Sequence, residues 1–407
     1  MQRLSLRAIR AAFVAVYAAV PLFPSFIALS GNSFPGVELI PLPLALAVLG
    51  LVCGLAIVAG VLLVRYPRRG AQPILVPIFT WFAASMLSAL AGFDPAAGVL
   101  FVSIFGLGAV WHASVMRFYG EPGVARAIFW SYLCSGALAS LAAVVMIATR
   151  VPAAQYAMQH GRATGTFVLP GELAAYLVVF LPIAFALARG ARERALRAVA
   201  WIALGCGALA FLLTFSRAGW MGLAATVAFL LAVRARRLRA GATAALLVVA
   251  AGAAAVLLLF NAHHDPSEDY TRIAIWRAAL QIIDRFPLTG VGPFDFSRLY
   301  ALVRVPDSEP SAYHAHSLYL TFFAELGILG LSAFLWTAWA FVAELRRRLA
   351  AATPQNAALA LAVTAGLFGV AVQGLIDTMS VVIFGLWLPT LALALATARD
   401  GLGEPPA

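Results

Sequence analysis

The chain has no lysine, and charged side chains make up only 11% of its 407 residues. A soluble globular protein carries about 25% charged residues, so the composition excludes that class. Cysteine is scarce as well. Cys53, Cys134 and Cys206 all lie in apolar runs without metal-ligand spacing, which indicates helix packing and gives no sign of the redox compartment.

Long apolar runs make up most of the sequence. Hydrophobic residues make up 63% of the chain, and runs of about 20 apolar residues, each long enough to cross a bilayer as a helix, recur along its length. The sequence therefore predicts an all-α polytopic membrane protein with about twelve transmembrane helices. The predicted spans are 10–29, 40–64, 73–91, 98–116, 127–149, 167–188, 198–215, 219–233, 242–260, 317–343, 357–376 and 380–398.

The arginines are distributed unequally between the two sides of the predicted membrane region. Of the 28 arginines, 20 fall on one set of connections between these spans, and by the positive-inside rule that side is cytoplasmic. We therefore expect both termini in the cytoplasm, and we read the net charge of +11 as a topology signal and not as a nucleic-acid site. The predicted divisions are spans one to nine (1–260), a large periplasmic loop (261–316), spans ten to twelve (317–398) and a short cytoplasmic tail (399–407).

The eight other arginines lie on the outer side, where topology gives no reason for them. They are Arg150, Arg162, Arg217, Arg272, Arg277, Arg285, Arg298 and Arg304. Five of the six histidines are predicted on that side too. Chemistry is best sought among these exceptions.

Part of the long outer loop reads as an amphipathic helix. In TRIAIWRAALQIIDRF, residues 271–286, an apolar stripe at helical spacing is formed by Ile273, Trp276, Ala279, Leu280 and Ile283. Arg277 falls on the polar face, whereas Arg272 falls over the stripe, where a guanidinium needs an anionic partner or must reach outward to water.

Two more arginines lie at span ends. Arg217, in TFSRAGW, occupies a tight turn between two spans, and Arg162 directly precedes an apolar span. Ionisable groups at such depth are costly and indicate function. The alternative for both is an arginine that anchors a helix end at the lipid headgroups.

Four further ionisable residues accompany the last spans. His314 and His316 directly precede one span, Glu325 lies within it, and Asp377 occupies the last hairpin. His316 is placed to accept a proton from a hydroxyl at the outer leaflet. Glu325 reads as a buried structural carboxylate. A zinc site of His-Ala-His with His263, His264 and Asp265 is conceivable, but no HExxH or cysteine spacing supports it.

Outer arginines suit a phosphate or diphosphate, because the guanidinium fork binds phosphate oxygens bidentately and stays charged. A lipid-linked diphosphate fits a site at a membrane surface. Sugar transfer from it requires neutralisation of the leaving diphosphate, which arginines supply without a metal, and a base, which one histidine supplies. We find no Asp-x-Asp motif, and we expect no metal and no cofactor.

Four segments together resemble the bacterial O-antigen ligase/polymerase superfamily: SRAGW (216–220), RIAIWRAALQII (272–283), PLTGVGPFDF (287–296) and HSLYLTFFAELGILG (316–330). Each motif alone is weak, and their order and placement carry the resemblance. It covers about 120 residues strongly.

The resemblance implies a metal-independent membrane glycosyltransferase of the GT-C-like kind in the inner membrane of a Gram-negative bacterium. It would move a glycan from undecaprenyl diphosphate to a lipid A–core hydroxyl at the periplasmic face. His316 would be the base, and Arg217 and Arg272 would bind the diphosphate, with Arg162 and Arg277 as weaker candidates. His314, Asp377 and Glu325 would support them.

The sequence departs from the family pattern at two places. Pro170 is followed by Gly171 and Glu172 where the family often has Pro-Asn, and Ser317 replaces the commoner asparagine. An O-antigen polymerase remains an alternative. An O-oligosaccharyltransferase is disfavoured by the short chain ends, and a lipid-linked glycan flippase by the few intramembrane charges.

Overall fold

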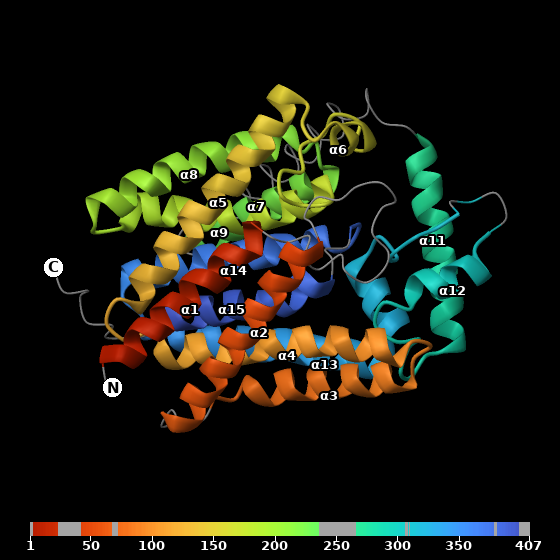
Figure 1. Cartoon of the computed structure of the whole chain (residues 1–407), viewed down its shortest axis with the longest axis horizontal. Coiled ribbons are helices and arrows are strands. Elements are labelled where there is room, and N and C mark those ends of the chain that lie inside the picture. Colours follow the sequence, from red (N-terminus) through yellow and green to blue (C-terminus); the bar gives the residue numbers. More distant parts are fainter. Residues whose placement is uncertain are drawn as a thin grey trace.

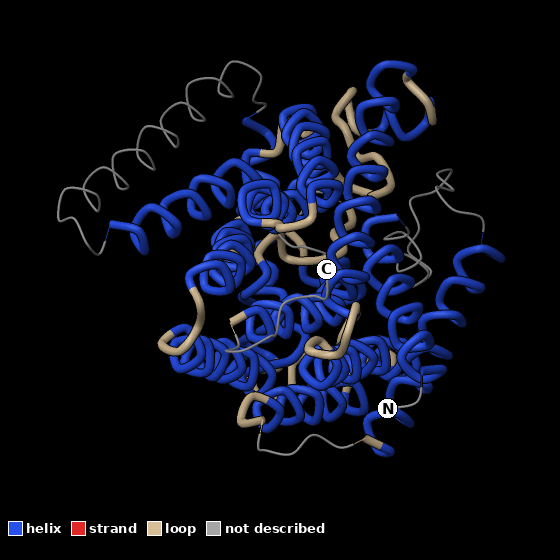
Figure 2. The backbone as a smooth tube through the Cα atoms, turned by 90° about the vertical axis from the view of Figure 1, so that its left-hand side faces the viewer, coloured by secondary structure: helices blue, strands red, loops and turns tan. Residues whose placement is uncertain are grey.

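The computed structural model describes residues 3–22, 42–66, 72–235, 266–305, 308, 310–377 and 381–398. Within these ranges the chain consists of helices and the loops that connect them (Figure 2). The predicted span 242–260 lies outside the described residues, as do His263, His264 and Asp265 of the conceivable zinc site.

Fourteen helices are described. They are α1 (Arg3–Leu22), α2 (Leu42–Arg65), α3 (Leu75–Ala91), α4 (Pro95–Phe118), α5 (Val124–Thr149), α6 (Ala153–Met158), α7 (Pro170–Gly190), α8 (Arg194–Leu213), α9 (Arg217–Ala235), α11 (Pro266–Arg285), α12 (Phe296–Val303), α13 (Leu318–Leu349), α14 (Pro354–Gln373) and α15 (Val381–Thr397).

The protein is an all-helical polytopic membrane protein. A described helix overlaps eleven of the twelve predicted spans, with ends that differ by a few residues. Seven helices in the described part are long and apolar enough to cross a membrane: α4, α5, α7, α8, α9, α13 and α14. Shorter apolar stretches occur at Gly54–Arg65, Leu75–Ala91 and Trp387–Thr397. The count of twelve spans stays a prediction.

Local sequence sets several helix starts. Asp94 accepts a hydrogen bond from the Ala97 N–H at 3.1 Å, and Pro95 occupies the first position of α4. Ser216 similarly accepts from the Gly219 N–H at 3.1 Å at the start of α9. Such caps satisfy backbone donors that have no partner inside the helix, and proline is favoured at the first position because it lacks one.

The long helices run alternately up and down one bundle, with α11 and α12 gathered at one end and the start of α1 at the other (Figure 1). The pairs α4–α15, α1–α5, α9–α14, α7–α8 and α3–α13 pack side by side. Consequently the starts of α7, α9 and α13 and the ends of α8 and α14 share the end that carries α11 and α12.

Helix α7 lies at the centre of the bundle. Most of its residues are buried, and Leu173, Leu177, Phe180 and Ile183 have no exposed surface. A helix that is apolar on every side is expected in such a core. Helix α7 contacts α8, α9 and α14, and α8 in turn packs on α5. These neighbours fix the position of the first turn of α7.

Helices α11 and α12 have an apolar core of their own, and the predicted stripe was partly wrong: Ala279 and Ile283 are buried in this core, but Ile273 and Leu280 are not. The buried face of α11 is Ile275, Ala278, Ala279, Ile282 and Ile283, packed with residues such as Phe296 and Tyr300. Ile273 is 43% exposed and Leu280 56% exposed. The face with the small residues Ala278 and Ala279 is the one that packs on α12 and α13, so the larger side chains of the expected stripe remain outside.

The PLTGVG segment joins this outer part to α13. The Val291 and Gly292 N–H groups donate to the carbonyls of Ala324 and Glu325 at 3.0 Å, and the Ile328 N–H donates to Pro287 at 2.8 Å. These bonds require an interruption of α13, which Gly327 supplies with φ 64° and ψ −170°. Only glycine adopts this backbone region readily.

Candidate active site

The residues before α13 form the centre of the site. The Leu318 N–H donates to the Gly374 carbonyl at 2.8 Å, which fixes the start of α13 against the end of α14. The Ala315 N–H donates to the Thr321 hydroxyl at 3.1 Å. The two histidines therefore lie on a short, backbone-anchored loop, and Ala315 and Ser317 beside them are buried.

His316 has a left-handed backbone, with φ 46°. Its N–H donates to Nδ1 of His314 at 3.2 Å, and the two rings meet edge to face with centroids 4.7 Å apart. The ring contact therefore places the two imidazoles next to each other. Nδ1 of His316 is buried, and none of the described residues forms a hydrogen bond with it.

Arg272 lies on α11, on the side that faces the bundle. It is half-buried and falls within the arc of the buried residues Ile275 and Ala279. Its charge reaches His316: burial first, and then the positive charge of Arg272, lower the pKa of His316 to about 4. The imidazole is therefore neutral at pH 7 and keeps a lone pair that can accept a proton.

Arg217 begins α9 and points toward α11. Its guanidinium lies 3.6 Å from the Asp269 carboxylate, which precedes Arg272 by three residues. This ion pair links the start of α9 to the start of α11. Because the Arg217 and Asp269 side chains are 27% and 53% exposed, water screens the pair and its net contribution to stability is small.

Arg162 is tied to the same turn. Its Nε donates to the Thr214 carbonyl at 3.1 Å, and the neighbouring Ala163 N–H donates to Leu213 at 2.9 Å. Thr214 lies in the turn between α8 and α9, three residues before Arg217. Contacts thus run from Arg162 through this turn to Arg217 and on to Asp269 of α11, the helix that also carries Arg272, whose charge acts on His316.

The charge of Asp377 acts on His314. Its carboxylate contacts Gly171 in the first turn of α7, at a point where any side chain on residue 171 would collide with it. Burial first, and then the neighbouring His316, lower the pKa of His314, the negative charge of Asp377 opposes both, and the net value is about 3. The departure Pro170-Gly171 from the family pattern therefore makes room for a carboxylate beside His314.

Two predicted site residues lie apart from this group. Arg277 is exposed, on the face of α11 opposite its buried residues. Glu325 is 2% exposed, and its carboxyl accepts hydrogen bonds from the backbone N–H groups of Phe294 and Phe296. Glu325 is thus buried, as the sequence indicates, and its partners lie in the PFDF segment and at the start of α12.

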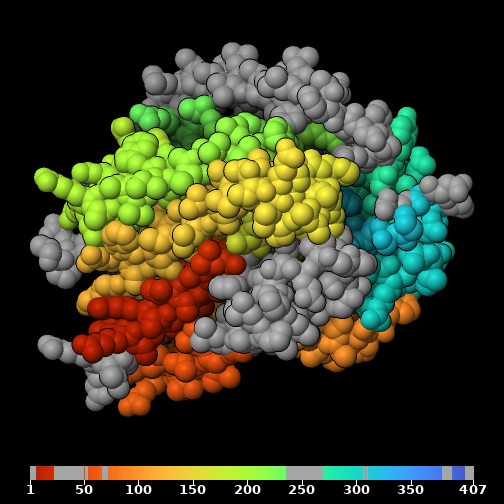
Figure 3. Space-filling view, turned by 45° about the horizontal axis from the view of Figure 1, so that its top comes forward, coloured from red at the N-terminus to blue at the C-terminus, as the bar shows by residue number. Residues whose placement is uncertain are grey.

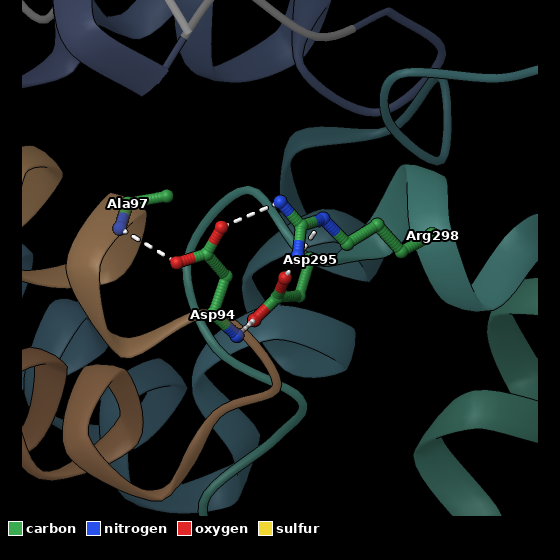
Figure 4. A network of polar contacts seen from close by, with 4 residues as sticks. All are labelled: Asp94, Ala97, Asp295 and Arg298. Atoms are coloured by element: carbon green, nitrogen blue, oxygen red, sulfur yellow. Dashed lines mark hydrogen bonds and ion pairs between the residues drawn. The ribbon is translucent and has the colours of Figure 1, made fainter. Parts of the chain in front are cut away.

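A polar network fastens that segment to the turn between α3 and α4 (Figure 4). The Asp94 N–H donates to the Asp295 carboxylate at 2.8 Å. The guanidinium of Arg298, a residue of α12, forms ion pairs with the carboxylates of both Asp94 and Asp295. The hydrogen bond from Ala97 lowers the pKa of Asp94, whereas burial raises that of Asp295. Arg298, one of the eight outer arginines, therefore has two carboxylate partners already.

Sequence reasoning missed Asp269 and the Thr214 carbonyl. Asp269 follows Glu268 in the first turn of α11, where acidic residues are common because they favour a helix N-terminus. Nothing in that pattern indicates a contact with Arg217. Within the described ranges, no three histidine, cysteine or acidic side chains gather as metal ligands would.

Part of the chain matches a known protein family. No curated protein matches the chain. Residues 201–335, which run from α8 to the first half of α13, match the family model described as O-antigen ligase. The matched range contains Arg217, Arg272, His314 and His316, whereas Arg162 and Asp377 lie outside it. The chain therefore carries an O-antigen ligase family domain over residues 201–335.

Proposed function

We propose that this protein is an O-antigen ligase that transfers a glycan from undecaprenyl diphosphate to a hydroxyl of lipid A–core, at the periplasmic face of the inner membrane of a Gram-negative bacterium. The family match supports glycan transfer from a lipid-linked donor. The single observation that carries the assignment of roles is the neighbourhood of Arg272 and His316, a permanent cation beside a buried, neutral imidazole.

His316 acts as the general base in this proposal. It takes the proton from the acceptor hydroxyl while the hydroxyl oxygen bonds to the anomeric carbon of the donor sugar. The bond from that carbon to the diphosphate oxygen breaks, and undecaprenyl diphosphate leaves. A bound diphosphate also raises the basicity of His316, because nearby negative charge favours the protonated imidazole.

Arg272 and Arg217 stabilise the leaving diphosphate. Guanidinium groups hold phosphate oxygens bidentately, and charge that is already in place where new charge develops costs no reorganisation during the reaction. No described carboxylate forms an ion pair with Arg272, so its charge can serve a ligand. Arg162 binds the Thr214 carbonyl in the α8–α9 turn, three residues before Arg217. Arg277 is a weaker candidate on account of its outward direction.

The positions of the arginines support a membrane orientation for this proposal. The described arginines of the predicted cytoplasmic side, such as Arg65, Arg117, Arg234 and Arg346, occupy the helix ends away from α11 and α12. Orientation by the positive-inside rule therefore puts the histidine loop on the periplasmic side. Both termini are cytoplasmic in this arrangement, and the span count is twelve.

A transfer assay with the purified full-length chain tests the proposal. Undecaprenyl-diphosphate-linked glycan serves as donor, in excess EDTA, with either lipid A–core or a second donor glycan as acceptor. We expect product on lipid A–core and no loss on chelation. Extension of the donor glycan instead would identify a polymerase, and the absence of any product, with donor translocation in vesicles, would identify a flippase and contradict the proposal.

A further inference from the structure

The backbone at His316 needs an explanation that the proposed reaction does not provide. A left-handed φ of 46° is uncommon for histidine and persists only where surrounding contacts hold it. The neighbouring backbone donors are fixed by distant partners: Ala315 donates to Thr321, and Leu318 donates to Gly374. The His316 N–H is different, because its partner is the imidazole of His314, two residues earlier.

This contact has the form of an Asx turn made by a histidine. In an Asx turn, an asparagine or aspartate oxygen, bonded to Cγ, accepts the N–H of the second following residue. Nδ1 of histidine is bonded to Cγ in the same way, and in His314 it accepts the His316 N–H at 3.2 Å. The acceptor role requires an unprotonated Nδ1, so the proton of the neutral ring lies on Nε2.

His314 has two further interactions besides this hydrogen bond. Its ring meets the ring of His316 edge to face, so it bounds one side of the imidazole that the proposed reaction uses. The charge of Asp377, whose carboxylate lies against Gly171 at the start of α7, also acts on His314. The position of His316 is thereby connected to α7 and to the end of α14 through one side chain.

We propose that His314 is the positioning residue for His316: its Nδ1 holds the left-handed backbone at His316, and this aims the catalytic imidazole at the acceptor hydroxyl. The proposal rests on the proposed function of His316. His314 touches neither donor nor acceptor in this account, and it acts through geometry alone.

Two substitutions separate the hydrogen bond from the ring. His314→Asn keeps an acceptor on Cγ and removes the ring, whereas His314→Phe keeps a ring of similar size and removes the acceptor. Misplacement of a reacting group by about 1 Å can cost roughly 100-fold in rate. We expect His314→Phe to lower kcat by roughly that factor with KM for the donor unchanged, and His314→Asn to retain most of the wild-type kcat.

The measurement is the transfer assay with the full chain, an undecaprenyl-diphosphate disaccharide as donor and lipid A–core as acceptor. His160→Ala is the matched control, because His160 is an exposed histidine with a similar φ of 51°. Thermal unfolding of each purified variant establishes that it folds. Wild-type kcat in His314→Phe overturns the positioning proposal, and so does an equal loss of kcat in the Asn and Phe variants.

The His316→Ala variant in the same assay distinguishes this failure from failure of the proposed function. If His316→Ala abolishes transfer and the two His314 variants behave alike, only the positioning role is wrong. If His316→Ala transfers glycan at the wild-type rate, the base assignment is wrong, and the positioning role falls with it.

Discussion

At the scale of single residues, the account depends on a histidine that is neutral because of where it lies. Burial and the Arg272 charge both disfavour the imidazolium form, and they lower the pKa of His316 to about 4. The cost is a weaker base in the free enzyme. The gain is that the base is unprotonated throughout the neutral range, before any substrate binds.

The pH dependence of kcat/KM follows from this shift. A base must be unprotonated to act, so activity is lost as the pH falls through the pKa of His316 in the free enzyme. We expect kcat/KM to stay flat from pH 8 to pH 5.5 and to fall only near pH 4, whereas an ordinary histidine would titrate near 6.5. An acid limb at pH 6.5 in the transfer assay would show that His316 is not buried beside a cation or is not the base.

Asp269 gives a second prediction at this scale. Its carboxylate pairs with Arg217, so a diphosphate that binds Arg217 must compete with it. We expect Asp269→Asn to tighten binding of undecaprenyl diphosphate by a few-fold, in keeping with the small energies of partly exposed ion pairs. Asp284→Asn, an exposed aspartate on the same helix, is the control. Weaker binding in Asp269→Asn would mean that the pair orients Arg217 for the ligand.

At the scale of elements, α13 is built from two helical pieces that meet at Gly327. The interruption frees the carbonyls of Ala324 and Glu325 for Val291 and Gly292, and it thereby fixes the PLTGVG segment and the helices on either side of it. The sequence motifs Pro-Leu-x-Gly-x-Gly-Pro and Glu-x-Gly thus meet in space. Their contacts are backbone bonds, which explains why the spacing of glycines matters there more than any side-chain chemistry.

Replacement of Gly327 tests this element. A side chain at φ 64° and ψ −170° is strained by about 1–3 kcal/mol, and its Cβ would also collide with the Leu288 carbonyl. We expect Gly327→Ala to lower the thermal unfolding temperature and the yield of folded protein. Gly205→Ala, in α8, is the control, because no atom lies within 4 Å of its Cβ position. Equal stability of the two variants would contradict the role assigned to the interruption.

The sequence predicts elements far better than it predicts contacts between them. A described helix lies at eleven of the twelve apolar runs that were predicted to be spans, since the bilayer sets the length and composition of such runs. The stripe on α11 was right at Ala279 and Ile283 but wrong at Ile273 and Leu280, because two adjacent faces are apolar and only packing on α12 and α13 selects the one with Ala278. Contacts such as Arg162 with Thr214, or Asp377 with Gly171, join segments far apart in the chain, and no local pattern encodes them.

At the scale of the whole molecule, the chain separates two kinds of arginine. One kind lies at the bundle end away from α11 and α12, which the positive-inside rule predicts to be cytoplasmic. The other kind includes Arg162 and Arg217, which meet the α8–α9 turn and α11, and Arg272 of α11, whose charge acts on His316. Helix α6, within the yellow region of Figure 3, lies at the surface toward the end of the bundle that carries α11 and α12.

Accessibility of introduced cysteines tests the orientation. In a chain whose three cysteines are replaced, we expect Leu302→Cys, on the strongly exposed surface of α12, to react with an impermeant maleimide added from the periplasmic side. Gln355→Cys, exposed at the start of α14, should react only after the inner membrane is opened. The reverse pattern would place the histidine loop in the cytoplasm and rule out a periplasmic reaction.

The most direct test of the central claim measures binding of undecaprenyl diphosphate and glycan transfer in the same variants. We predict that Arg272→Gln loses affinity by roughly 10-fold or more, as expected for removal of a charge-assisted hydrogen bond. Arg285→Gln, also on α11 but exposed, should bind as the wild type does. His316→Ala should bind the lipid normally and transfer nothing. Wild-type affinity in Arg272→Gln, or continued transfer by His316→Ala, would contradict the account.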